Sequence, residues 1–441
     1  MKYKGLGLAV IVVLGLAGCK SAASLPPKSQ SQQLLKAQKE RITHSVIKKA
    51  ASNIRVLVPQ SEKKRDLVDP ATYKQFADAE LSKVKGEKRT KAAYVTFTGT
   101  PTYRNFWRLI PSVRVYQNVD GKTKLKRTTK LDGLNVDMVT GAKVTLASLV
   151  TGPKQMQALN YRAFAQAVAH KGYTSAQLQQ ARQIGFFKNL QAANFRLAAD
   201  SLTIYPDKNQ LGIKQLKLPM SSIAGYLTKL NKVREPDFRN KKVVALTFDD
   251  GPNPKTTPTV LATLKKEHVK ATFFMVGYEV KANPQLTRAV VHAGHEVGTH
   301  TYDHKSLAYL NPAAALQEIV TASDAMYAAT GTMPMMMRPP YGAVNAAHDS
   351  SIPLPSIQWA VDSQDWRVHA PGPIIARINA STYPGSIILM HDIHPQSVAA
   401  LPNVIKSLKA KGYSFVTVSE LLGKYLLPGE QYFGSGDHRA I

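Results

Sequence analysis

Two adjacent carboxylates, Asp249 and Asp250, end an apolar run that begins at Val243. Gly251 and Pro252 follow at once, so the pattern predicts a buried strand whose carboxyl end presents two acids at a turn. Two like charges side by side are costly unless a cation or a shared proton lies between them. We therefore expect this strand end to be the centre of a site.

A histidine pair, His300 and His304, lies downstream of the acids, and the two imidazoles are four positions apart in the sequence. This spacing lets two imidazoles converge on one ion. With an Asp from the strand end, the pair completes a two-His, one-carboxylate set that leaves positions open for water and substrate. The same set can hold redox iron, so the ligands alone do not fix the reaction.

Three further segments carry reactive side chains. Arg338 precedes the rigid turn Pro339–Gly342, where a permanent cation can pair with a carboxylate and keep it ionised. The segments Asp362–Trp366 and Leu389–Asp392 each follow a predicted strand. Alone, each has an ordinary interpretation as a surface turn, a cap or a structural histidine. Their order at successive strand ends favours one composite site.

The elements that would position these side chains alternate from residue 241 onward. Strands are expected near 243–248, 271–276, 297–299, 357–361, 387–390 and 414–418, and helices near 258–267, 284–293 and 312–330. Repeated β–α units predict an α/β fold with a largely parallel sheet or barrel, and with functional loops at the carboxyl ends of the strands.

Together, these segments resemble the five motifs of the polysaccharide deacetylase family (NodB homology proteins, carbohydrate esterase family 4). The matching segments are Thr247–Pro252, His300–His304, Arg338–Gly342, Asp362–Trp366 and Leu389–His391. The resemblance covers about residues 241–425. It implies a distorted (β/α) barrel and metal-dependent removal of N-acetyl groups from polymers of amino sugars.

The resemblance also implies roles at the strand end. Asp250, His300 and His304 would bind a divalent metal, with zinc expected and cobalt or manganese as alternatives. Asp249 would be the general base that deprotonates the attacking water, and Arg338 would pair with it. Successive side chains leave a strand in opposite directions, so one acid could bind metal while the other acts as base.

The remaining motif residues would complete the reaction. By resemblance, His391 is the general acid for the departing amine, and Asp362 orients His391 and raises its pKa. The backbone N–H of Tyr341 would help to hold the oxyanion. Trp366 and Leu389 would wall the small pocket that receives the acetyl methyl group.

The N-terminus has the features of an export signal. Lys2 and Lys4 precede an apolar run of 13 residues, 5–17, which is shorter than the roughly 20 residues of a membrane-spanning helix. The run ends in Leu16-Ala17-Gly18-Cys19, which resembles a bacterial lipoprotein signal with Cys19 as the lipidated first mature residue. The single Cys excludes a disulfide within the chain. We expect an exported protein, lipid-anchored to the outer face of the cell membrane.

The net charge of +29 is unevenly placed. Residues 241–441 hold 17 Lys and Arg against 15 Asp and Glu, which leaves 41 basic and 14 acidic residues, a net charge of +27, for residues 1–240. Such an excess should attract a polyanion. Because export makes nucleic acid an unsuitable partner, we expect an anionic membrane surface or wall polymer.

The sequence predicts six segments. They are a signal peptide (1–18), a lipid-anchored basic tether with a short helix within 34–53 (19–92), a smaller α+β accessory domain (93–232), a linker (233–240), the catalytic domain (241–425) and a C-terminal tail (426–441). Two stretches of the accessory segment, 137–149 and 218–227, resemble a domain that precedes the catalytic domain in some exported cell-wall deacetylases.

Our leading hypothesis is a surface-anchored enzyme that removes N-acetyl groups from the amino sugars of peptidoglycan and releases acetate. A secreted poly-N-acetylglucosamine or chitin-like glycan is an alternative substrate. A non-catalytic glycan-binding protein on the same scaffold, and a metal-dependent amidohydrolase acting on a non-sugar amide, are alternatives of other classes. Every motif residue with an implied role is present, which favours an enzyme.

Overall fold

The computed structural model describes residues 28–40, 42, 44–86, 90–150, 152–169, 172–183, 194–206, 211–227, 236, 238, 241–348 and 351–441. The chain divides into two compact units, 1–143 and 144–441. The predicted signal peptide with Cys19, and most of the predicted linker 233–240, lie outside the described residues. No helix in the described part of the chain is long and apolar enough to cross a membrane.

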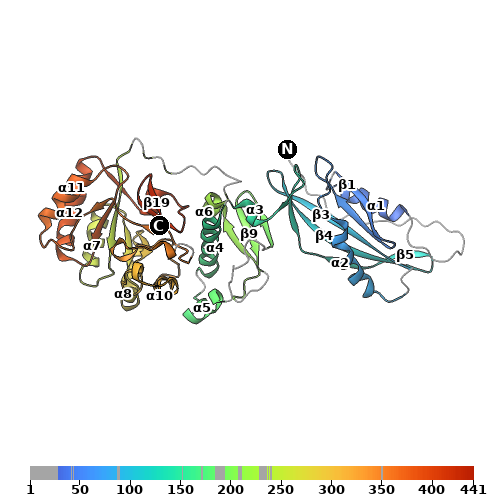
Figure 1. Ribbon diagram of the computed structural model, residues 1–441, viewed down its shortest axis with the longest axis horizontal. Coiled ribbons are helices and arrows are strands. Elements are labelled where there is room, and N and C mark those ends of the chain that lie inside the picture. Colours follow the sequence, from blue (N-terminus) through green and yellow to red (C-terminus); the bar gives the residue numbers. More distant parts are fainter. Residues whose placement is uncertain are drawn as a thin grey trace. The chain divides into compact units, whose positions relative to one another are not determined.

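The first unit is a twisted sheet covered by helices (Figure 1). Its elements are α1 (Lys28–Lys39), β1 (Ser45–Ala51), β2 (Ile54–Pro59), α2 (Pro70–Ser82), β3 (Lys91–Tyr103), β4 (Phe106–Val119), β5 (Lys122–Lys130), β6 (Leu134–Asp137) and β7 (Lys143–Val144). The strand order is β1-β2-β3-β4-β6-β7, and β5 also pairs with β4. Buried side chains of α2, such as Tyr73 and Ala77, pack on one face of this sheet.

This arrangement differs from the sequence prediction in two ways. The helix expected within 34–53 ends at Lys39, and the chain then forms β1. The expected boundary at 92/93 falls inside one sheet, because β2 pairs in parallel with β3. Residues 45–59 are therefore part of a folded unit and not of a tether. Contacts within the described chain also divide the expected accessory domain 93–232 between the two units.

The second unit begins with a small helical and sheet segment. Its elements are α3 (Leu146–Leu149), α4 (Pro153–Val168), α5 (Ser175–Gln183), β8 (Asn194–Leu197), β9 (Ser201–Tyr205), β10 (Leu216–Pro219), α6 (Met220–Ile223) and the 3₁₀ turn η3 (Ala224–Tyr226). Arg182 on α5 donates two hydrogen bonds to the carboxylate of Asp324. Lys154 on α4 pairs with Glu430 at 3.0 Å. These bonds join the segment to residues 241–441.

The rest of the second unit alternates strands and helices as predicted. Its elements are β11 (Val243–Asp249), α7 (Thr257–Lys266), β12 (Thr272–Met275), α8 (Gly277–Ala282), α9 (Pro284–His292), β13 (Glu296–Thr299), η4 (Leu307–Tyr309), α10 (Pro312–Thr330), η5 (Pro340–Gly342), η6 (Ala346–His348), β14 (Ser356–Ile357), β15 (Val361–Asp362), α11 (Pro371–Ser381), β16 (Ile387–His391), α12 (Pro395–Ala410), β17 (Ser414–Val416), α13 (Val418–Leu422), β18 (Glu430–Gly434) and β19 (Asp437–Ala440).

The sheet of this part is parallel and irregular. Its main order is β13-β12-β11-β16-β15, with β17 beside the start of β11. Single bridges at Met337 extend the sheet from β13 to β14, where β18 and β19 are added. A curled α/β half-barrel results, and its helices surround the sheet (Figure 1). The predicted tail 426–441 contains the hairpin β18–β19, which belongs to this fold.

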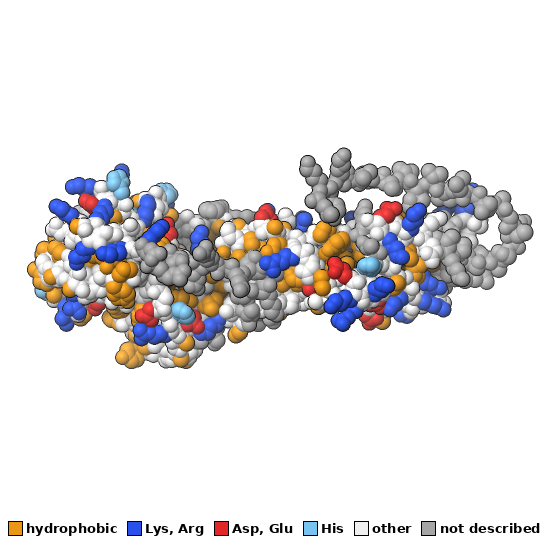
Figure 2. All heavy atoms as spheres, turned by 90° about the horizontal axis from the view of Figure 1, so that it is seen from above, with side chains coloured by type: hydrophobic (Ala, Val, Ile, Leu, Met, Phe, Trp, Pro, Cys, Tyr) orange, Lys and Arg blue, Asp and Glu red, His pale blue; other side chains and the backbone are white. Residues whose placement is uncertain are grey.

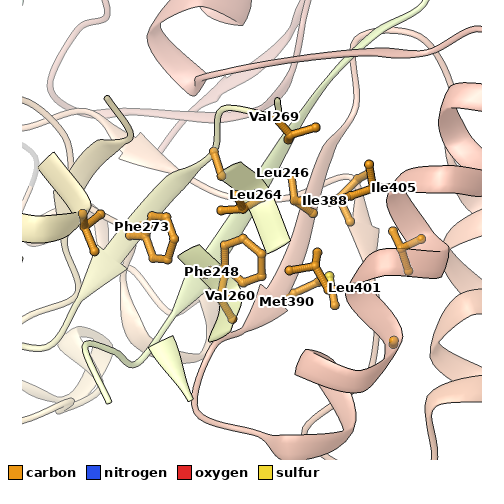
Figure 3. Close-up of a cluster of buried hydrophobic side chains, with 14 of the residues drawn as sticks. Leu246, Phe248, Val260, Leu264, Val269, Phe273, Ile388, Met390, Leu401 and Ile405 are labelled. Carbon is orange, nitrogen blue, oxygen red and sulfur yellow. The ribbon is translucent and has the colours of Figure 1, made fainter. Parts of the chain in front are cut away.

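The core behind the site consists of side chains from the central strands and the helices that cover them (Figure 3). All seven residues of β11 are buried, as expected for a parallel strand covered on both faces. Phe248 stacks on Phe273 with ring centroids 5.1 Å apart. Leu401 and Ile405 of α12 pack against the same cluster. This packing fixes the carboxyl ends of β11 and β16 relative to one another.

Basic side chains are widespread on the surface. Few acidic side chains lie between the Lys and Arg side chains on the face seen in Figure 2. In the first unit, β5 carries Lys122, Lys124, Lys126 and Lys130, all of them exposed. Lysines on an outer strand also discourage pairing with another sheet, so this strand has a structural explanation as well as an electrostatic one.

Candidate active site

The strand end at β11 holds the two acids in different backbone conformations. Asp249 is the last residue of β11 and is 2% exposed. Asp250 leaves the strand with φ of 75°, in the left-handed region that non-glycine residues seldom adopt. This turn separates the two carboxylates and gives each a different set of neighbours.

Asp249 lies against a buried arginine. The guanidinium of Arg338 donates to Asp249 Oδ1 at 2.8 Å and to Thr247 Oγ1 at 2.7 Å. It also donates to two backbone carbonyls, and it lies 4.2 Å from the ring centroid of Phe274. Arg338 is fully buried and held on every side, so it presents a fixed positive charge to Asp249.

Asp250 faces two imidazoles. Its Oδ1 lies 3.4 Å from His300 Nε2 and 3.2 Å from His304 Nε2. Among the described residues, these three form the group that could hold a metal ion, with ligand atoms within 4.8 Å of one another. Asp250 Oδ1 is buried without a hydrogen-bond partner in the described structure.

The donor set fits a divalent cation. Two ligands held at about 2.1 Å in tetrahedral geometry lie about 3.4 Å apart, which is close to the separations around Asp250 Oδ1. His300 Nδ1 lies 2.7 Å from the carbonyl oxygen of Arg338. A proton on Nδ1 would donate to this carbonyl and leave the lone pair of Nε2 for the ion.

The loop that carries both histidines is held from helix α10. One carboxylate oxygen of Glu318 accepts the backbone N–H groups of Tyr302 and Asp303, at 3.0 and 2.9 Å. Its other oxygen pairs with Lys305 at 2.9 Å. Glu318 is buried, so these charge-assisted bonds fix the loop between the two histidines. No spacing pattern in the sequence singled out this residue.

His391 stands at the end of the neighbouring strand, where it is the register partner of Asp249. Its Nδ1 lies 2.7 Å from Asp365 Oδ1, and its backbone N–H donates to Asp365 Oδ2 at 2.8 Å. Burial lowers the pKa of His391, but the hydrogen bond and charge of Asp365, together with the charges of Asp249 and Asp250, outweigh burial and raise the pKa to about 9. A protonated imidazole therefore faces the acids of β11.

The partner of His391 is a correction to the sequence prediction, which assigned this position to Asp362. The carboxylate of Asp362 accepts the backbone N–H of Gln364 at 2.8 Å in a local turn. This turn brings Asp365, three residues later and fully buried, to the imidazole. Ser397 donates a further hydrogen bond to Asp365. The second Asp of the motif was visible in the sequence, but its direction depends on the turn.

The three residues predicted to bind substrate differ in exposure. Tyr341 has φ of 62°, is 72% exposed and meets the His304 ring edge-on at 5.0 Å between centroids. Trp366 is 54% exposed, whereas Leu389 is 5% exposed within β16. The two exposed rings are thus open to a ligand, and Leu389 can offer only a small apolar surface.

The turn that contains Tyr341 is fixed by an amide pair that sequence reasoning missed. Gln358 Nε2 donates to the carbonyl of Gly342 at 3.0 Å and to Gln431 Oε1 at 2.9 Å. Gln358 is buried, and Gln431 lies on β18. The C-terminal hairpin is therefore connected to the turn beside His304.

A buried carboxyl group lies beneath the turn after Asp250. Asp392 accepts a hydrogen bond from Thr257, and a Cβ on Gly251 would come within 2.4 Å of its Oδ1. Burial raises the pKa of Asp392 to about 7. Only glycine leaves room for this carboxyl group at position 251.

Known proteins are similar to this chain in sequence. The family model described as polysaccharide deacetylase matches residues 238–352. The chain is 33% identical over 396 residues to the peptidoglycan-N-acetylglucosamine deacetylase PgdA of Listeria monocytogenes serotype 1/2a (strain 10403S). The matched region covers 86% of this chain and 84% of that protein. This chain belongs to the polysaccharide deacetylase family.

Two further matches cover a smaller share of the chain. The peptidoglycan-N-acetylmuramic acid deacetylase PdaC of Bacillus subtilis (strain 168) is 40% identical over 182 residues, which are 41% of this chain and 39% of that protein. A solved structure of peptidoglycan deacetylase PdaC from Bacillus subtilis covers 41% of this chain and 90% of its own, with 40% identity and a TM-score of 0.41.

Proposed function

We propose that this protein hydrolyses the N-acetyl groups of amino sugars in peptidoglycan, by metal-assisted catalysis, and releases acetate. The membership of the chain in the polysaccharide deacetylase family supports a hydrolase of this class. The names of the two relatives above support peptidoglycan as the glycan.

One observation carries the proposal: the Asp249–Arg338 pair and the His391–Asp365 pair lie at the ends of adjacent parallel strands, with the group Asp250, His300 and His304 beside them. A base and an acid on opposite sides of one position are what amide hydrolysis requires.

Asp250, His300 and His304 would hold the cation. When bound, a divalent ion supplies Lewis acidity that polarises an acetamide carbonyl and lowers the pKa of water. Zinc suits a two-His, one-carboxylate set, and cobalt or manganese are alternatives.

The chain supplies the proton transfers. Asp249, paired with Arg338, would accept a proton from water as the water oxygen attacks the acetamide carbon. The backbone N–H of Tyr341 would donate to the carbonyl oxygen as it gains negative charge. His391 Nε2 would then give its proton to the departing nitrogen, so that the C–N bond breaks into acetate and a free amine.

The test is acetate release from purified N-acetylated peptidoglycan, with mass spectrometry of the muropeptides to locate the free amines. Asp249→Asn should bind metal and release no acetate, because the amide is a poor base. His300→Ala should lose both metal and activity. Full metal occupancy in His300→Ala by elemental analysis would refute the ligand assignment, and normal turnover by Asp249→Asn would remove Asp249 from the role of base.

We also propose that the protein acts outside the cell, attached through a lipid on Cys19, with its basic half drawn to anionic lipid or wall polymer. The motif at residues 16–19 and the charge of residues 1–240 support this proposal. Labelling with radioactive palmitate should mark the wild type and not Cys19→Ser. Equal labelling of both would contradict the anchor. Retention of the unlipidated variant by isolated walls should fall steeply with salt.

A further inference from the structure

Tyr309 is the most exposed large apolar side chain in the described part of the chain, at 91%. Single exposed aromatics are common on protein surfaces and need no function by themselves. The position of this one is unusual, because it lies five residues after His304 on the short turn η4.

The turn that presents Tyr309 is fixed on both sides. Leu307 is fully buried in an apolar cluster that includes Ile319 and Met337, and Leu310 packs against the same cluster. The carbonyl of Leu310 lies 2.9 Å from Nε2 of the buried His348. The ring of Tyr309 is therefore held out to solvent by a rigid support and not by a loose loop.

The same contacts connect this turn with the turn of Tyr341. Asn345, three residues after Gly342, donates to the carbonyl of Ala308 at 3.4 Å. Tyr341 is itself 72% exposed and touches His304. Two exposed tyrosines thus stand on turns bonded to one another, one at a histidine of the site and one further out. The chain length allows at most about 18 Å between the Cα atoms of His304 and Tyr309.

We propose that Tyr309 is a binding platform for a second sugar of the glycan strand, away from the sugar whose acetamide reacts. A pyranose ring has a face of polarised C–H groups, which matches the negative face of an aromatic ring. A platform that is already ordered loses little conformational entropy when it binds. This inference rests on the proposed function for its choice of glycan, and it adds a requirement for a long substrate.

The test compares Tyr309→Ala with Tyr309→Phe in the full-length protein, on N-acetylglucosamine oligomers of two and six sugars. For Tyr309→Ala we expect KM for the hexamer to rise about tenfold, as for one lost stacking contact, with kcat and the dimer kinetics unchanged. Tyr309→Phe keeps the ring and should stay within twofold of wild type.

Tyr383→Ala is the matched control. Tyr383 is 48% exposed, but it precedes β16, whose far end carries His391. The five residues of this strand place it about 16 Å from the site. Tyr383→Ala should leave both substrates unaffected. An unchanged hexamer KM in Tyr309→Ala, or an equal loss on dimer and hexamer, would overturn the platform.

Hexamer binding by calorimetry, in a background carrying Asp249→Asn, separates this proposal from the proposed function. If the wild type releases no acetate, the proposed function fails. The platform still predicts about tenfold weaker hexamer binding when Tyr309→Ala is added to that background. Equal binding with and without Tyr309→Ala refutes the platform, whatever the activity.

Discussion

Replacing Asp365 by Asn tests the assignment of His391 as the general acid. Burial lowers the pKa of His391, but the hydrogen bond and charge of Asp365, with smaller contributions from Asp249 and Asp250, together raise it to about 9. Asn removes the negative charge and keeps nearly the same shape. Without that charge, burial opposes only the smaller contributions of Asp249 and Asp250, so the pKa of His391 should fall toward its ordinary value of 6.5.

The size of the effect follows from this change of pKa. A fall from about 9 to about 6.5 is about 2.5 units, or about 3.4 kcal/mol of stabilisation of the imidazolium. At pH 8 the protonated fraction of His391 would fall from about 90% to about 3%, which lowers kcat about thirtyfold. At pH 5 both forms are protonated, so the two enzymes should differ much less there.

The assay is the pH dependence of kcat for acetate release. The high-pH limb should move from about 9 in the wild type to about 6.5 in Asp365→Asn. Asp362→Asn is the matched control, because Asp362 bonds to Gln364 and not to His391. Its limb should remain at about 9. If Asp365→Asn keeps the wild-type limb, or if Asp362→Asn moves it, the assignment of the partner is wrong.

Three further predictions concern residues around the site. Gln431→Leu should lower kcat about tenfold at constant KM, because Gln358 loses its acceptor. Gln431→Glu keeps an acceptor oxygen and should recover most of kcat. Equal kcat values for both variants would show that Gln431 does not support the turn of Tyr341. Glu318→Ala should weaken metal binding about 10–100-fold in a titration, and Glu318→Gln should have an affinity between those of the wild type and Glu318→Ala. An unchanged affinity would show that Glu318 does not hold the loop between His300 and His304 in place. The pKa of His295 is lowered to about 4, mainly by burial, so its contribution to stability is present above pH 6.5 and is lost as the pH falls through 4. Chemical denaturation at pH 7 and at pH 4 measures this: between the two, the free energy of unfolding of the wild type should fall by up to about 3 kcal/mol more than that of His295→Gln. Equal falls for both proteins would contradict the prediction.

Sequence reasoning located the parts of the site that local pattern determines. The apolar run before Asp249 required a buried strand, and β11 is buried along its whole length. The four-residue spacing of His300 and His304 brought them to one carboxylate oxygen. Both predictions needed only the periodicity of a strand and the reach of a short loop.

Residues whose role depends on distant pairing could not be predicted in this way. Glu318 and Gln431 are ordinary polar residues in the sequence, and only the packing of α10 and β18 brings them to the site. The N-terminal boundary failed for the same reason. β2 pairs with β3 between residues 39 positions apart, such as Val56 and Val95, and no local signal specifies such a pairing.

The two adjacent acids show why the backbone matters as much as the residue types. Opposite directions along an ideal strand would separate Asp249 and Asp250, but Asp250 has already left the strand, with φ of 75°. Its conformation, strained for a residue with a Cβ, turns its carboxylate to the imidazoles, while Asp249 stays extended against Arg338. A residue that tolerates positive φ less well at position 250 would relax toward the strand and turn its side chain away from the two imidazoles. The left-handed turn therefore gives the two neighbouring carboxylates separate partners: Asp249 pairs with Arg338, and Asp250 faces the imidazoles of the two histidines.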